Sequence, residues 1–164
     1  NMAPAGLTVV IVKKSIVGNE LPLTPEIMSY KVQIEKDSML NTPPCWCIYI
    51  LGLTLDWIEN KAGIEMMQKN AWERASLVYD FLDESSFYIK RAETGSRSPM
   101  NVTFRTPSEE LDDAFCKDAE QKGLLSLRGH KTTGGIRASL YNAMPADGAK
   151  ALLEFMKEFE IRHV

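Results

Sequence analysis

The stretch Met100-Asn-Val-Thr-Phe-Arg-Thr-Pro-Ser-Glu109 predicts a strand that is followed at once by a helix. Residues 100–105 favour a strand, and Thr106-Pro-Ser-Glu109 has the form of a capping box with proline at the first helical position. Gly123 is placed to end this helix. The side chains expected to face inward from it are Leu111, Phe115 and Ala119. Strand and helix therefore alternate in the second half of the chain.

Strand and helix patterns also occur before and after this stretch. Residues 87–90 predict a preceding strand, and residues 124–127 and 136–141 predict two more strands around a glycine-rich loop. A last helix is expected over residues 146–162, with Leu152, Met156 and Phe159 buried. The predicted order is thus β-β-α-β-β-α, which is typical of a compact α+β unit with its own core.

The first part of the chain predicts an incomplete α/β layer. Leu7-Thr-Val-Val-Ile-Val12 is a short β-branched run, as expected of an interior strand, and Tyr30–Ile34 alternates as a second short strand would. A helical turn is expected at Pro25-Glu-Ile-Met28. A long apolar helix should follow Pro43-Pro44 and reach about Lys61, where Gly63 breaks it.

A second long helix, from Ile64 to about Glu84, joins the two parts. Its apolar residues form one helical stripe, made by Ile64, Met67, Ala71, Ala75, Val78 and Leu82. The predicted fold class is α/β, with one piece over residues 1–70 and a small α+β domain over residues 71–164.

Composition narrows the possible functions. The 164 residues are 45% hydrophobic and 25% charged, which excludes disordered, collagen-like and coiled-coil classes. The formal net charge of −3 provides no field that would attract nucleic acid or an anionic membrane. We therefore expect no nucleic-acid or membrane partner, and any anion-binding site must be local.

The three cysteines, Cys45, Cys47 and Cys116, predict reduced and packed thiols. They form no CxxC pair and have no histidine at metal-ligand spacing, so no metal site is expected. The apolar run from Cys45 to Leu55 is too short to span a bilayer, and the first residues do not resemble a signal peptide. A reducing, cytoplasmic location is the expectation.

Asn41-Thr42-Pro43-Pro44 is the first candidate anion site. Proline is well tolerated at the first helical turn, where its missing N–H is not needed, and Thr42 can act as the N-cap. The free amides and the positive end of the helix dipole then favour an anion, with the side chains of Asn41 and Thr42 as additional donors. The alternative interpretation is simply a well-capped helix.

Gly129-His-Lys-Thr-Thr-Gly-Gly-Ile-Arg137 is the second candidate. Its glycines allow backbone amides to approach a ligand, and His130 and Arg137 flank the glycine pair. Arginine suits bidentate contact with carboxylate or phosphate, and Lys131 supplies a point charge. A site for a small dianion is the sharper interpretation, and a solvated hairpin with incidental charge is the alternative.

Five ordered stretches give the chain a family resemblance. They are Asn1–Val12, Ser38–Pro44, Arg97–Phe104, Gly129–Met144 and Phe155–Phe159. In this register the whole chain resembles the phosphoserine aminotransferases. Long ordered matches of this kind are far more specific than a single short motif.

The resemblance implies a pyridoxal 5'-phosphate enzyme of the aspartate-aminotransferase fold type, which forms a homodimer. It implies transfer of an amino group from glutamate to 3-phosphohydroxypyruvate, giving phosphoserine and 2-oxoglutarate in serine biosynthesis. A second role in pyridoxine biosynthesis is also implied. Residues 1–70 would then be the remainder of the cofactor-binding large domain with its connecting helix, and residues 71–164 the small domain.

The resemblance also assigns site residues. Asn41 and Thr42 would bind the cofactor phosphate of the partner subunit. His130, Lys131 and Arg137 would bind the substrate's phosphate and carboxylate. Lys131 stands where the family usually has arginine, which replaces a forked contact with a point charge.

The family's Schiff-base lysine would immediately precede Asn1, so the resemblance assigns no catalytic residue to this chain and makes it a carboxyl-terminal portion. By this resemblance the chain would supply anion recognition and would be inactive alone. Two alternatives stay open: a non-catalytic anion-binding or dimerisation fragment, and a pyridoxal-phosphate aminotransferase with another substrate.

Overall fold

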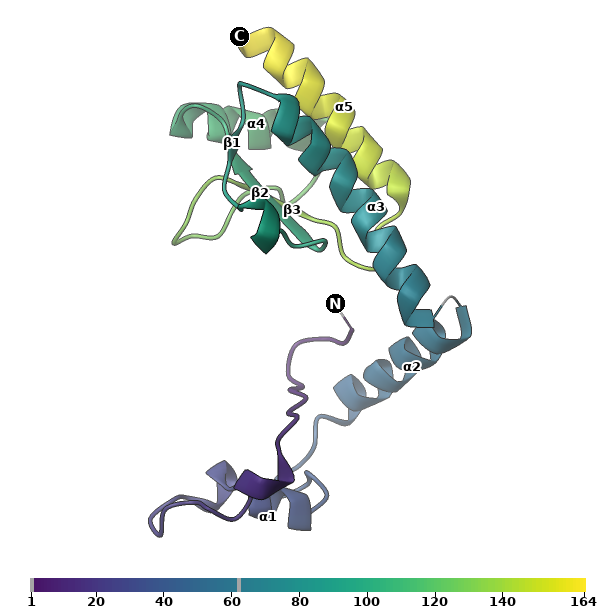
Figure 1. Cartoon of the computed structure of the whole chain (residues 1–164), viewed down its shortest axis with the longest axis vertical. Helices are drawn as coiled ribbons and strands as arrows, with labels where there is room; N and C mark the ends of the chain where they lie inside the picture. The colour runs from purple at the N-terminus through teal and green to yellow at the C-terminus, as the bar shows by residue number, and fades with distance from the viewer. Residues whose placement is uncertain (1, 62) are drawn as a thin grey trace. The chain divides into compact units, whose positions relative to one another are not determined.

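The computed structural model describes residues 2–61 and 63–164, which fall into two compact units divided at about residue 62 (Figure 1). The first unit contains two single 3-10 turns and two α-helices. Their bounds are η1 Lys14–Ile16, η2 Glu26–Met28, α1 Tyr30–Glu35 and α2 Cys45–Lys61. The predicted turn at residues 25–28 and the predicted long helix up to Lys61 are confirmed.

The strand predicted over Leu7–Val12 is wrong. This segment has no regular structure, and Val9, Val10 and Ile11 are exposed, Ile11 to 96%. A strand needs a neighbour for its backbone hydrogen bonds, and residues 2–61 contain no strand that could pair with it. The sequence pattern is that of an interior strand, but the described unit offers no sheet to join.

The strand predicted over Tyr30–Ile34 is also wrong, because these residues form helix α1. Ser29 caps the helix: its Oγ accepts a hydrogen bond from the Val32 amide at 3.2 Å and donates one to Glu20 Oε1 at 2.8 Å. A capped turn satisfies the backbone locally, which an isolated alternating segment cannot do.

The second unit combines a small sheet with three helices and a 3-10 turn. In chain order the elements are α3 Gly63–Glu84, β1 Ile89–Lys90, η3 Thr94–Ser96, β2 Asn101–Arg105, α4 Glu109–Gln121, β3 Ile136–Ser139 and α5 Ala146–His163. The sheet is antiparallel in the order β1-β2-β3. Helices α3 and α5 pack alongside each other (Figure 1).

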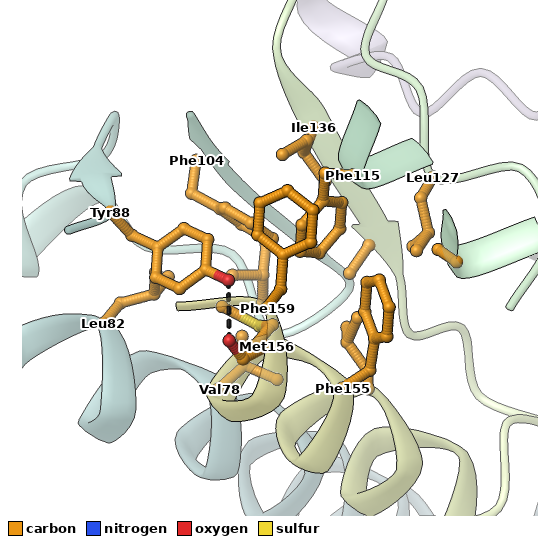
Figure 2. Packing of buried hydrophobic residues seen from close by; sticks show 14 of the residues in the cluster. Val78, Leu82, Tyr88, Phe104, Phe115, Leu127, Ile136, Phe155, Met156 and Phe159 are labelled. Atoms are coloured by element: carbon orange, nitrogen blue, oxygen red, sulfur yellow. Dashed lines mark hydrogen bonds between the residues drawn. The ribbon is translucent and has the colours of Figure 1, made fainter. Parts of the chain in front are cut away.

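One face of the sheet packs on the helices, and the other carries the polar side chains. Val102 and Phe104 of β2 and Ile136 and Ala138 of β3 are buried, whereas the residues between them are partly exposed. Figure 2 shows the aromatic core that they join, where Phe115 lies among other rings. This alternation fixes which side chains can reach a ligand.

The core also buries a few polar groups. Tyr88 donates a hydrogen bond from its hydroxyl to the Met156 carbonyl at 2.8 Å (Figure 2), which satisfies the only polar atom of that side chain. Burial raises the pKa of Tyr88 far above its usual value, so it remains a neutral donor.

The predicted capping box is displaced by two residues. Helix α4 begins at Glu109 with Ser108 as its N-cap, and the Ser108 Oγ accepts from the Leu111 amide at 3.3 Å. Thr106 is buried instead, and its amide and hydroxyl both lie 2.8 Å from Asp112 Oδ1. The Thr106 side chain is therefore hydrogen-bonded to the Asp112 carboxylate, and Ser108 caps the helix in its place.

The end of α4 confirms the predicted role of Gly123. Its φ is +80°, and the Leu124 amide donates to the Ala119 carbonyl at 2.9 Å, as in a Schellman motif. The strand predicted over residues 124–127 is wrong: Ser126 has a φ of +60°, which interrupts an extended backbone. Only an isolated bridge between Arg128 and Ile136 remains.

The helix predicted from Ile64 to about Glu84 is confirmed as α3, which lies within the second unit, and its stripe is buried from Ala71 onward, whereas Ile64 is exposed. The last predicted helix is confirmed as α5. The three cysteines are free thiols, as expected, although Cys45 is exposed. Within the described residues, none of the helices is both long enough and apolar enough to cross a membrane.

Candidate functional site

The sheet places Arg137 on its polar face. Thr103 and Arg137 are directly paired across β2 and β3, and both point away from the buried face because their neighbours Val102, Phe104 and Ile136 point into the core. Arg137 Nε is buried and has no hydrogen-bond partner in the described part of the chain. A buried guanidinium N–H of this kind is available to an anionic ligand.

The glycine-rich loop folds back over the end of β3. The Gly129 amide donates to the Gly135 carbonyl at 2.8 Å, and the Gly134 amide donates to the His130 carbonyl at 2.8 Å. A Cβ on Gly129 would lie only 2.1 Å from the Gly134 carbonyl oxygen. The loop can therefore close this tightly only with glycine at position 129.

A pocket of about 330 Å³ lies between this loop and the sheet, and it brings His130 and Arg137 together. Its lining residues are Arg91, Thr103, Gly129, His130, Thr133, Gly134, Ile136 and Arg137. None of these is acidic. With two guanidinium groups and an imidazole around a small space, the pocket suits an anion.

Lys131 does not line that pocket. It borders a neighbouring hollow of about 430 Å³ together with Arg105, Glu109 and Asp112 among others. His130 lines both hollows, whereas Arg137 lines only the first and Lys131 only the second. The carboxylates of the second hollow balance its cations, which makes it the less suitable of the two for an anion.

Arg91 lies just after the strand predicted over residues 87–90, and the sequence did not indicate it as a site residue. Its Nη1 donates to the Thr133 carbonyl at 2.8 Å, and Arg105 Nη2 donates to the same oxygen at 2.8 Å. No local sequence signal marks Arg91, because its place depends on strand register: Lys90 pairs with Phe104, and the same register continued by one residue sets Arg91 opposite Thr103.

Asn41 and Thr42 are both exposed and precede helix α2. The predicted role of Thr42 as N-cap is wrong: the first intrahelical bond runs from the Ile48 amide to the Pro44 carbonyl, so Pro44 holds the cap position. The reason is that the helix starts only at Cys45, after both prolines. The two predicted cofactor-binding side chains therefore lie just outside the helix and are open to solvent.

No group of three or more His, Cys, Asp or Glu side chains that could hold a metal ion occurs among residues 2–61 and 63–164. Comparison with known proteins identifies the family of the chain. The model of one protein family, described as aminotransferase class-V, matches residues 1–152. The chain belongs to the class-V aminotransferase family.

The sequences of curated relatives in this family align with nearly the entire chain. The phosphoserine aminotransferase of Aromatoleum aromaticum is 45% identical over 163 residues, which cover 99% of this chain and 44% of the relative. That of Bacillus cereus is 40% identical and covers 99% of this chain and 45% of the relative. The chain thus spans less than half the length of the relatives it matches.

Solved aminotransferase structures have the same fold. The phosphoserine aminotransferase of Bacillus circulans subsp. alkalophilus matches with a TM-score of 0.92 and 41% identity, over 100% of this chain and 46% of that one. A structure describing radiation damage of the Schiff base in phosphoserine aminotransferase matches with a TM-score of 0.90 and 45% identity, over 99% of this chain and 45% of that one. The predicted fold class, part of an α/β aminotransferase, is confirmed.

Proposed function

We propose that this chain is part of a phosphoserine aminotransferase, which transfers the amino group of glutamate to 3-phosphohydroxypyruvate and gives phosphoserine and 2-oxoglutarate. Relatives of that name are about 45% identical over almost the whole chain. The observation that carries the proposal is the pocket that joins His130 and Arg137 and has no acidic lining residue. A small substrate with a phosphate and a carboxylate matches this chemistry.

Within the pocket, Arg137 supplies a planar fork for an anionic group of the substrate, and His130 supplies a hydrogen-bond donor. These contacts bind and orient the substrate, which lowers the barrier by positioning and not by chemistry of their own. Lys131 is proposed as a substrate-binding residue on the resemblance alone, because it lines the neighbouring hollow.

We propose pyridoxal 5'-phosphate as the cofactor, with its phosphate held by Asn41 and Thr42. The donors fit: both side chains are exposed, and the amides of Trp46 and Cys47 precede the first intrahelical bond of α2. When bound, the cofactor supplies an electron sink for proton removal at the substrate α-carbon. The Schiff-base lysine is proposed to precede Asn1 directly, and Asn1 itself lies outside the described residues.

We further propose a homodimer in which Asn41 and Thr42 reach the cofactor phosphate bound by the other subunit. Their exposure leaves them free for a ligand held by another chain. Residues 1–70 are proposed as the remainder of the cofactor-binding domain with its connecting helix, and residues 71–164 as the small domain. The enzyme is proposed to act in the cytoplasm, in serine biosynthesis and also in pyridoxine biosynthesis, and the three free thiols suit that compartment.

The test is phosphoserine formation by the full-length enzyme with its cofactor, given glutamate and 3-phosphohydroxypyruvate. Hydroxypyruvate, which lacks the phosphate, is the matched control substrate and should react at least about tenfold less efficiently, since a charge-assisted contact is worth about 1.5–3 kcal/mol. Equal use of both substrates would favour an aminotransferase of another specificity. No amino transfer to either would favour the non-catalytic alternative.

A further inference from the structure

Arg91 completes a row of three side chains across the polar face of the sheet. Ile89 pairs with Arg105 and Lys90 with Phe104, and the same register continued one residue past the end of β1 sets Arg91 opposite Thr103, which pairs with Arg137 on its other side. Side chains two residues apart on a strand share a face, and Arg91 therefore points to the same side as Arg105, Thr103 and Arg137. The two guanidinium groups that flank Thr103 line the same pocket.

The Arg91 side chain is held in place without being neutralised. Its Nη1 donates to the Thr133 carbonyl at 2.8 Å, which leaves the other N–H groups of the guanidinium available. It makes no ion pair within the described part of the chain, whereas Arg97 is paired with Asp83 and Arg105 lies 3.7 Å from Glu109. Arg91 thus contributes an uncompensated positive charge to a pocket without acidic lining residues.

We infer that Arg91 is a further substrate-binding residue, which contacts an anionic group of the phosphorylated substrate beside the group held by Arg137. This inference rests on the proposed function. The two arginines are separated by two strand spacings, roughly 10 Å between their backbones, so they approach a bound molecule from opposite sides. A phosphate monoester carries close to two negative charges at neutral pH, and a second guanidinium favours it over a carboxylate.

The decisive variant is Arg91→Gln in the full-length enzyme with its cofactor bound. Glutamine removes the charge but retains an N–H that can donate to the Thr133 carbonyl. We expect the KM for 3-phosphohydroxypyruvate to rise at least about tenfold, with a smaller rise in the KM for glutamate and little change in kcat. Arg91→Lys retains the charge but loses the fork, and it should recover part of the affinity.

Arg105→Gln is the matched control, because Arg105 donates to the same Thr133 oxygen but borders the other hollow. If Arg91 acted only by bracing the loop, the two glutamine variants would raise the KM for 3-phosphohydroxypyruvate equally, and the inference would be overturned. A change below about twofold in Arg91→Gln would overturn it as well.

Measuring the affinity for phosphoserine distinguishes a failure of this inference from a failure of the proposed function. Isothermal titration of the cofactor-loaded enzyme with phosphoserine should show affinity reduced at least about tenfold in Arg91→Gln. If the unaltered enzyme neither binds phosphoserine nor forms it, the proposed function fails. If the unaltered enzyme does both and Arg91→Gln matches it, only the role of Arg91 fails.

Discussion

Thr103 and Arg137 are paired directly across β2 and β3, on the face of the sheet that points away from the aromatic core. Arg137 therefore has its backbone fixed by a sheet and its guanidinium in a pocket, with a buried Nε that has no partner in the described part of the chain. Because the sheet already holds the backbone of this cation in place, binding an anion costs little conformational entropy.

Replacing Arg137 with alanine should raise the KM for 3-phosphohydroxypyruvate at least about tenfold, because a charge-assisted hydrogen bond contributes about 1.5–3 kcal/mol. Steady-state kinetics of the full-length enzyme measure this. Ser139→Ala is the control, since Ser139 lies on the same strand and face but does not line the pocket, and its hydroxyl donates to Asn101 Oδ1 at 3.4 Å. An unchanged KM in Arg137→Ala would remove Arg137 from the site.

Gly129→Ala should open the loop that carries His130. The added Cβ would meet the Gly134 carbonyl oxygen at 2.1 Å, and relief requires backbone movement that costs about 1–3 kcal/mol. We expect a lower melting temperature and weaker binding of phosphoserine, measured by thermal unfolding and titration. Gly95→Ala is the control, because nothing lies within 4 Å of its added Cβ; similar losses in both variants would contradict the role of the closed loop.

The Asp83 carboxylate should make the second unit sensitive to acid. Its hydrogen bonds with Arg97, at 2.5 and 2.7 Å, lower the pKa of Asp83 from 3.8 to about 2. Because the pKa in the folded state is lower than in the unfolded state, the stabilisation is complete above about pH 4 and is lost as the pH falls toward 2.

The comparison that tests this is the melting temperature of the unaltered protein and of Asp83→Asn between pH 6 and pH 2. The variant should be less stable at pH 6, and the difference should shrink toward pH 2, because asparagine cannot be protonated there. A difference that stays constant over this range would show that the ion pair does not set the acid response. Direct titration of the Asp83 carboxyl by NMR gives the pKa itself.

Phe115→Ala should destabilise the second unit by about 3–5 kcal/mol, the usual cost of removing a fully buried ring. Phe115 has no exposed surface and lies 4.9 to 6.1 Å, between ring centroids, from Phe104, Phe155, Phe159 and Tyr88. Urea unfolding measures the loss, and Phe115→Leu should lose less because it leaves a smaller cavity. Equal stability of the two variants would contradict tight packing at this position.

The long helices could be predicted from sequence alone, because their apolar stripes and the glycines at their ends are local signals. Helix α3 and helix α5 occur where periodicity predicted them, and Gly123 ends α4 with a positive φ. The glycine-rich loop and the proline-opened helix are predicted as anion sites from local sequence as well, and these two assignments stay predictions. Resemblance over five ordered stretches indicated the aminotransferase family, which the family comparison confirmed.

Which residues share a pocket depends on contacts between distant segments, and these form only in the folded chain. Arg91, Thr103 and Arg137 line one pocket, whereas Lys131 lines only the neighbouring hollow. The tertiary structure also decided that Leu7–Val12 is no strand in this unit, since extended backbone needs a neighbour and hydrophobic pattern alone cannot provide one. Local patterns specify local hydrogen bonds, whereas a binding site depends on the register between strands, which forms only when the whole sheet assembles.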